Sequence, residues 1–258
     1  MDGLRHSLLR KSLVVLLAVG VGLLVVSDLS TTDGAESAEK KDAYYHRRMS
    51  MVKDDIAGTS WGRTGVKDKA VLKAMRSVLR HKFVPARSAG QAYADRPLPI
   101  GYGQTISQPY IVAYMTEMLE PEKDHVAIEI GTGSGYQAAV LAKVVKQVYT
   151  IEVIPELGES AAKRLKEMDY ANVEVRVGDG YHGWKEHAPF DVIIVTAAAS
   201  HIPPPLIEQL KPGGRMAIPV GPPFQVQQLM LIQKRDDGSV VKRSVMPVRF
   251  VPLTREKE

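Results

Sequence analysis

The sequence predicts an α/β fold: a doubly wound, mostly parallel sheet that ends in antiparallel strands and carries an N-terminal helical extension. From residue 126 to about residue 210, short Val and Ile runs alternate with helix-length segments. Such alternation is typical of a parallel sheet covered by helices on both faces. After residue 210, strand-like runs follow one another with only turns such as DDGS between them, which indicates antiparallel strands.

The first 50 residues differ from the rest of the chain. Residues 12–26 are an uncharged apolar run that follows Arg5, Arg10 and Lys11, so we interpret residues 1–27 as a signal peptide or membrane anchor. Residues 28–50 are polar and rich in helix-breaking residues, which predicts a flexible linker before a folded domain over residues 51–258. Translation from Met49 or Met51 is an open alternative that would remove this region.

Two helices and one long connection are predicted between the linker and the sheet. Residues 66–80 place apolar side chains at helical spacing between Lys and Arg, which predicts an amphipathic helix. Residues 81–108 contain too many prolines and glycines for regular structure, and a connection of this length inside a domain is usually functional. Residues 109–119 follow as a helix with Pro109 at its first position.

Composition restricts the classes of function. With 258 residues, of which 45% are apolar and 24% charged, the chain resembles a globular protein. The net charge of +5 is modest and no long block of Lys and Arg is present, so we expect no nucleic-acid partner. The sequence has no cysteine, which excludes disulfides, thiolate nucleophiles and cysteine-ligated zinc, and no paired His or carboxylate spacing indicates a metal.

A glycine-rich stretch, EIGTGSGYQ, joins the first predicted strand of the sheet to its helix. Gly131, Gly133 and Gly135 permit positive φ angles and let a ligand approach the backbone, and the start of the helix favours a carboxylate or phosphate. A nicotinamide dinucleotide is the alternative ligand, but its G-x-G-x-x-G pattern requires glycine where this chain has Tyr136.

Acidic residues stand at the ends of three successive predicted strands: Glu129, Glu152 and Asp179. Glu152 is placed to accept hydrogen bonds from two ribose hydroxyls, and Asp179 from an adenine amino group. Glu129 then serves an ammonium group, and a ligand with an ammonium group, a ribose and an adenine is S-adenosylmethionine. Each acid taken singly is equally consistent with an exposed carboxylate at a strand end.

These motifs resemble the protein-L-isoaspartate O-methyltransferase family over residues 66–254. The most specific is LPIGYGQTISQPYIV, which is similar to the family's substrate-side signature. The others match in the same order: EIGTGSGYQ, GDGYHGW, FDVIIVTAAAS, LKPGGRMAIPVG and RFVPLT. The resemblance implies a Rossmann-like methyltransferase sheet and an S-adenosylmethionine-dependent methyltransferase domain over residues 51–258.

The resemblance also implies roles for single residues. Ser107 matches the residue treated as the family's catalytic serine, and Thr105, Ile106 and Gln108 match its substrate-binding neighbours. The residues expected to bind the cofactor are Glu129, Gly131, Thr132, Gly133, Ser134, Gly135, Glu152, Asp179 and Gly180. Capping of the helix that begins at Pro109 is a second role open to Ser107 and Thr105.

The implied activity is that of a protein-L-isoaspartate(D-aspartate) O-methyltransferase. Methyl transfer to the free α-carboxylate of L-isoaspartyl residues in damaged proteins would initiate repair through a methyl ester and a succinimide. A carboxylate with a pKa of about 4 is already a nucleophile at neutral pH, so the lack of an evident catalytic His or Cys agrees with this activity. The alternatives are a methyltransferase for another carboxylate or small molecule, and a non-catalytic tethered nucleotide-binding domain.

The expected partners are isoaspartyl-containing proteins and peptides. We expect membrane contact only through residues 12–26, and a monomeric enzyme. The leader indicates export to the periplasm or an N-terminal anchor. The usual location of the resembled family's members and the synthesis of the cofactor in the cytoplasm instead favour the cytoplasm. The sequence leaves the location open.

Overall fold

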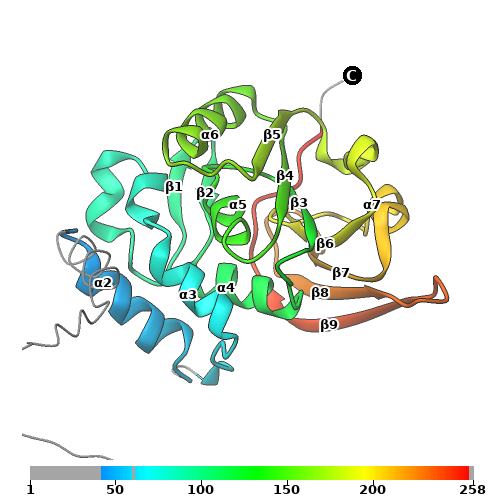
Figure 1. The fold of residues 1–258 in the computed structure, drawn as a ribbon, viewed down its shortest axis with the longest axis horizontal. Helices are drawn as coiled ribbons and strands as arrows, with labels where there is room; N and C mark the ends of the chain where they lie inside the picture. Colours follow the sequence, from blue (N-terminus) through cyan, green and yellow to red (C-terminus); the bar gives the residue numbers. More distant parts are fainter. Residues whose placement is uncertain (1–41, 60–61, 256–258) are drawn as a thin grey trace, which may run out of the picture. The chain divides into compact units, whose positions relative to one another are not determined.

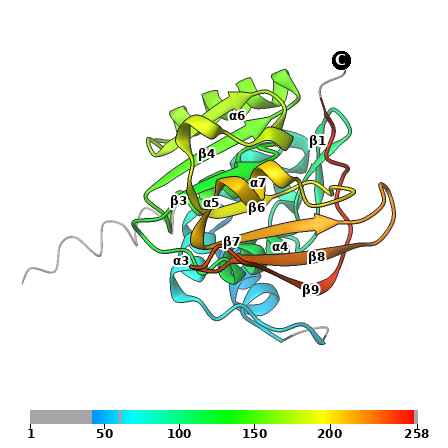
Figure 2. The same ribbon diagram turned by 90° about the vertical axis from the view of Figure 1, so that its right-hand side faces the viewer.

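A seven-stranded sheet lies at the centre of the structure, a computed structural model that describes residues 42–59 and 62–255 (Figure 1). The strand order is β5-β4-β3-β6-β7-β8-β9. The strands are β3 (Val126–Ile130), β4 (Gln147–Glu152), β5 (Val173–Val177), β6 (Phe190–Val195), β7 (Leu210–Val220), β8 (Gln227–Lys234) and β9 (Val240–Val248). Neighbours from β5 to β7 are parallel, whereas β8 and β9 are antiparallel and extend one end of the sheet (Figure 2). The predicted fold class is confirmed.

Helices cover both faces of the sheet. They are α3 (Lys69–Ser77), α4 (Pro109–Met118), α5 (Tyr136–Leu141), α6 (Pro155–Glu167) and α7 (Pro204–Gln209), with single turns η5 (Gly180–His182) and η6 (Lys185–His187). Ala127 and Val192 belong to one buried apolar cluster, which includes side chains of α3, α4 and α5. Ile128 and Ile193, one position further along each strand, belong to a second cluster on the side of α7. Burial of alternate residues in two cores explains the continuous Val and Ile runs.

The helical extension begins earlier than predicted. Helix α2 (Tyr45–Ser50) leads into the π-helical turn η1 (Met51–Ile56), and the compact unit starts at Ala43. The predicted flexible linker over residues 28–50 is therefore wrong at its C-terminal end. Arg48 is only 1% exposed and its Nε donates to the carbonyl oxygen of Arg76 at 2.7 Å, so a charged residue that suggested a linker is part of the core.

The predicted signal peptide or anchor, residues 1–27, and linker residues 28–41 lie outside the described part of the chain. Among the helices of residues 42–59 and 62–255, none combines the length and hydropathy needed to cross a bilayer.

The long connection before α4 is more regular than predicted. It contains the 3-10 turns η3 (Arg80–Phe83) and η4 (Ala86–Gln91) and a two-stranded hairpin of β1 (Leu98–Gly101) and β2 (Gln104–Ile106). Tyr102 and Gly103 both have positive φ angles and form the turn of this hairpin. The hairpin ends just before Pro109, which occupies the first position of α4 as predicted.

Several predicted helices are shorter in the structure. Helix α3 occupies only the middle of residues 66–80, because the Asp68 side chain caps it by accepting from the Val71 N–H at 2.8 Å. Helix α5 ends at Leu141, after which the chain continues in turns to β4. Both differences concern the ends of elements and leave the order of strands and helices unchanged.

Candidate active site

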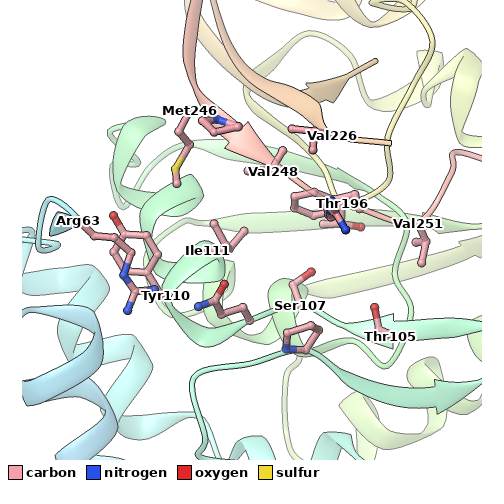
Figure 3. Close-up of a pocket in the computed structure, with 15 residues that line it drawn as sticks. Arg63, Thr105, Ser107, Tyr110, Ile111, Thr196, Val226, Met246, Val248 and Val251 are labelled. Atoms are coloured by element: carbon pink, nitrogen blue, oxygen red, sulfur yellow. The ribbon is translucent and has the colours of Figure 1, made fainter. Parts of the chain in front are cut away.

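Three adjoining cavities lie at the carboxyl ends of the parallel strands, where open α/β sheets usually bind ligands. Figure 3 shows the residues that line the largest of the three. The largest, here the substrate cavity, has a volume of about 440 Å³ and is lined by residues of β2, α4 and β9. The second and third, of about 50 and 40 Å³, are lined by the glycine-rich loop after β3. Thr105 and Thr196 line all three, so these two threonines mark the point at which the cavities meet.

The loop after β3 has the backbone that its glycines predicted. Gly131, Gly133 and Gly135 have φ angles of 97°, 52° and 87°. A Cβ atom on Gly131 would lie 2.5 Å from Thr196 Oγ1, which itself donates to the Gly131 carbonyl oxygen at 2.6 Å. The predicted residues Thr132 and Ser134 line the third cavity in the same loop.

Glu152 stabilises this loop as well as lining the second cavity. Its Oε2 atom accepts from the Gly133 N–H at 2.7 Å, and its Oε1 atom accepts from the Ile154 N–H at 3.1 Å. The side chain is 5% exposed, and the two backbone N–H groups hold its oxygens in position. A carboxylate held in this way keeps unused lone pairs for two ligand hydroxyls.

Glu129 is buried, contrary to the alternative of an exposed strand-end carboxylate. Its Oε2 atom accepts from Thr150 Oγ1 at 2.6 Å, whereas its Oε1 atom is buried without a hydrogen-bond partner. Burial raises the pKa of Glu129 to about 8, with a smaller contribution from the charge of Glu152. Glu129 also lines the third cavity, so its unpaired oxygen suits a cationic ligand group such as an ammonium.

Asp179 does not line any of the three cavities, although its neighbour Gly180 lines the second. Its Oδ1 atom accepts from the Tyr181 N–H at 2.9 Å, and its Oδ2 atom accepts from Arg255 Nε at 2.7 Å. At Gly180, a Cβ atom would lie 2.5 Å from Ile130 Cγ2. The structure therefore brings Gly180 to the cavities and holds Asp179 beside them in an ion pair.

The second cavity, which Gly180 lines, is also lined by the C-terminal strap, defined here as residues 249–255. Figure 2 shows this segment leaving β9 and passing the hairpin that contains β1. Ala198 fixes it through two backbone hydrogen bonds of 2.8 Å, one to the Val251 carbonyl oxygen and one from the Leu253 N–H. Residues 251–254 of the strap line the second cavity.

Ser107 joins the substrate cavity to the third cavity, because it lines both. Of the other predicted substrate-loop residues, Gln108 lines the substrate cavity and Ile106 the third. No side chain of residues 105–108 caps α4: the first free N–H, that of Tyr110, instead donates to Asp95 Oδ1 at 2.8 Å. The capping role left open for Ser107 and Thr105 is therefore filled by Asp95.

Sequence reasoning missed four residues of this site: Arg63, Asp95, Thr196 and Arg255. Arg63 and Thr196 line the substrate cavity, and Asp95 and Arg255 contact predicted site residues. Thr196 lies inside the motif FDVIIVTAAAS and follows directly after β6, which was the available signal. Arg63 and Asp95 belong to no motif, and only folding brings them beside the substrate loop.

Comparison with known proteins agrees with this geometry. The model of the family protein-L-isoaspartate(D-aspartate) O-methyltransferase (PCMT) matches residues 59–258. The sequence is 57% identical over 236 residues to a protein-L-isoaspartate O-methyltransferase 2 of Syntrophobacter fumaroxidans, covering 90% of this chain and 95% of that one. It is 50% identical over 243 residues to a protein-L-isoaspartate O-methyltransferase 1 of Cupriavidus necator, covering 94% and 92%.

Solved structures show the same relationship. A protein-L-isoaspartate O-methyltransferase with 29% identity superposes with a TM-score of 0.69, over 81% of this chain and 65% of that one. A Plasmodium falciparum protein of the PCMT type, solved with S-adenosyl-L-homocysteine, superposes with a TM-score of 0.67 at 26% identity, over 81% and 99%. The Rossmann-like methyltransferase sheet and the resemblance seen in the motifs are confirmed: the chain belongs to the protein-L-isoaspartate(D-aspartate) O-methyltransferase family.

Proposed function

We propose that this protein transfers a methyl group from S-adenosylmethionine to the free α-carboxylate of L-isoaspartyl residues in damaged proteins and peptides. The methyl ester that forms returns to a succinimide, part of which opens to normal aspartate, so methylation initiates repair. One observation carries the proposal. Ser107 lines both the substrate cavity and the cavity that contains the unpaired carboxylate oxygen of Glu129, so acceptor and cofactor meet at this residue.

The residues around the two small cavities fit the cofactor. S-adenosylmethionine supplies a methyl group on a positively charged sulfur. Glu129 Oε1 is the acceptor for its ammonium group, and Glu152 is the acceptor for its ribose hydroxyls. Gly131, Gly133 and Gly180 allow close approach of the ligand to the backbone. Asp179 serves the adenine amino group, which competes with Arg255 for this carboxylate.

The substrate cavity positions the acceptor. The α-carboxylate is anionic at neutral pH and needs no general base, so the hydroxyl of Ser107 acts as a hydrogen-bond donor that orients it. Apolar walls formed by Ile111, Val248 and Val251 exclude water from the carboxylate. Exclusion of water and alignment of oxygen, methyl and sulfur are then the main contributions of the protein to the rate.

The organisation of the chain is part of the proposal. We assign the methyltransferase domain to the unit that starts at Ala43, and keep residues 1–27 as a signal peptide or anchor that provides the only membrane contact, through residues 12–26. Its substrates are isoaspartyl proteins and peptides. We further propose that the enzyme is monomeric and has no nucleic-acid partner, consistent with its modest net charge of +5.

Methyl transfer from labelled S-adenosylmethionine to matched peptides tests this function. The peptides differ only in carrying isoaspartate, aspartate or asparagine at one position. We expect base-labile label on the isoaspartyl peptide alone. If the protein binds S-adenosylhomocysteine but labels none of the three peptides, the substrate is another carboxylate or small molecule and the repair function is wrong.

A further inference from the structure

We propose that Arg63 is a positioning residue for the isoaspartyl substrate, which it serves by holding Asp95 in place and by cancelling the negative charge of Asp95 beside the substrate cavity. The inference rests on the proposed function and concerns the same cavity. Arg63 lines the substrate cavity but neither of the two smaller cavities, so its influence is expected on the methyl acceptor and not on the cofactor.

The guanidinium of Arg63 is fixed by two contacts. Its Nη1 atom lies 2.9 Å from Asp95 Oδ2, and its central carbon lies 4.2 Å from the centre of the Tyr110 ring. The side chains of Arg63 and Asp95 are 19% and 10% exposed, so water screens the ion pair only weakly. Figure 3 shows Arg63 and Tyr110 on one side of the cavity and Ser107 and Thr105 on the other.

Asp95 connects this ion pair to the substrate loop. Its Oδ1 atom accepts from the Tyr110 N–H at 2.8 Å, and its Oδ2 atom accepts from Gln108 Nε2 at 2.8 Å as well as from Arg63. Gln108 follows Ser107 directly, and Pro109 separates Gln108 from Tyr110. The carboxylate of Asp95 therefore fixes the start of α4 and, through Gln108, the position of the loop that contains Ser107.

Charge gives Arg63 its second role. Burial raises the pKa of Asp55 and the charge of Asp95 raises it further, whereas the charge of Arg63 opposes this rise. Arg63 is thus a cation paired with the carboxylate of Asp95 beside a cavity whose proposed ligand is itself a carboxylate. Without Arg63, an uncompensated negative charge would repel the substrate.

A purely structural role makes a different prediction from a charge-balancing one. If Arg63 only supplied hydrogen bonds and packing, removal of the Asp95 charge in addition would add a second defect. If Arg63 cancels the charge of Asp95, replacement of Asp95 by asparagine should compensate for the loss of Arg63. Asparagine also retains an oxygen that can accept from the Tyr110 N–H, so the start of α4 keeps its cap.

The experiment compares the full-length wild type with Arg63→Met, Asp95→Asn and the double variant. The measurements are the KM and kcat for an isoaspartyl peptide, the Kd for S-adenosylhomocysteine by calorimetry, and the melting temperature. The control is Arg96→Met, an exposed arginine of the same connection that lines none of the three cavities. Should Arg63→Met fail to fold, Arg63→Lys replaces it, since lysine keeps the charge without the planar geometry.

We expect Arg63→Met to raise the peptide KM by roughly five- to thirtyfold while the Kd for S-adenosylhomocysteine changes less than about twofold. The double variant should recover most of this loss, and Arg63→Lys should lie between the wild type and Arg63→Met.

Two outcomes for the peptide KM overturn the inference while the proposed function stands: an unchanged KM in Arg63→Met, or a double variant as impaired as Arg63→Met or more so. An equal loss of peptide and S-adenosylhomocysteine binding would also overturn it, since it would indicate a general distortion. Failure of the proposed function has a separate signature. In that case the wild type transfers no methyl group to any isoaspartyl peptide, and both proposals fall together.

Discussion

Arg255 Nε donates a hydrogen bond to Asp179 Oδ2 at 2.7 Å, which links the C-terminal strap to the loop after β5. The guanidinium also lies 4.0 Å from the centre of the Tyr181 ring, and the Asp179 side chain is 11% exposed. The carboxylate proposed to bind the adenine amino group is thus already paired within the protein. In the proposed function, the adenine amino group therefore competes with Arg255 for Asp179.

Replacement of Arg255 by glutamine should therefore strengthen cofactor binding. An ion pair with one exposed partner contributes little, so we expect the Kd for S-adenosylhomocysteine to fall by roughly two- to fivefold. Calorimetry at low salt measures the change, and Arg243→Gln, at an exposed position of β9, provides the control. Weaker binding in Arg255→Gln would show that Arg255 contacts the cofactor directly and would contradict the prediction.

Ser107→Ala should impair methyl transfer without affecting the cofactor. A hydrogen bond to a charged group contributes about 1.5–3 kcal/mol, so we expect kcat/KM for the isoaspartyl peptide to fall by roughly ten- to one-hundredfold. The Kd for S-adenosylhomocysteine should stay within about twofold, because no cofactor group is assigned to this hydroxyl. Ser244→Ala, on β9, is the matched control. A variant with wild-type kcat/KM would exclude Ser107 as the carboxylate donor.

Cofactor binding should depend on pH through Glu129. Its pKa of about 8 in the folded protein means that the carboxyl is largely protonated at pH 7, whereas an ammonium ligand requires the ionised form. Affinity for S-adenosylhomocysteine should therefore rise with pH by up to about tenfold per unit below pH 8 and level off above it. Glu129→Gln should bind weakly at every pH and lose this dependence, whereas Glu174→Gln, on β5, should behave as the wild type.

The same carboxyl also affects stability in the absence of ligand. Below its ordinary value of 4.5 the group is protonated in the folded and unfolded states alike, so it makes no difference there. As the pH rises from 4.5 towards 8, the unfolded chain loses the proton first, and the folded state loses stability. Glu129→Gln should be more stable than the wild type at pH 8 in thermal unfolding. Equal melting temperatures at pH 8 would show that the carboxyl ionises without cost in the fold.

Arg48→Ala tests whether helix α2 belongs to the domain. Arg48 Nε donates to the Arg76 carbonyl oxygen at 2.7 Å and Nη1 to Tyr93 Oη at 3.3 Å, and the side chain is 1% exposed. Its loss removes both hydrogen bonds and a packed side chain from the core, so we expect the free energy of unfolding to fall by about 2–4 kcal/mol. The neighbouring exposed Arg47→Ala should cost less than about 0.5 kcal/mol in the same denaturant titration. Equal losses of stability in the two variants would show that α2 belongs to the linker and not to the folded domain.

The sheet and the cofactor loop are predictable from the sequence because their physical requirements are local. Strands buried on both faces must be continuously apolar, and the turn after β3 must use glycine where φ is positive. The ionisation of Glu129 is not predictable in this way. Its raised pKa comes from the surrounding core and from Glu152, which approaches only when β3 and β4 pair.

The residues missed by sequence reasoning are those whose role comes from a partner distant in the chain. Arg63 and Asp95 are 32 positions apart, and in the sequence each is an ordinary charged residue of an irregular segment. The sequence predicts Arg48 in a linker for the same reason, since burial of an arginine depends on acceptors from other elements. Pairing of this kind has no period and no motif that the sequence would reveal.

The size of the substrate cavity has a consequence for which damage can be repaired. About 440 Å³ admits an isoaspartyl residue and parts of its neighbours, but not a folded element of another protein. A damaged residue in a terminus or a mobile loop can enter directly, whereas one inside a helix or sheet must first be released by local unfolding of its own protein. The rate of repair at buried sites then depends on how often the substrate protein opens locally. Isoaspartyl residues in the most stable regions of proteins would therefore be repaired most slowly.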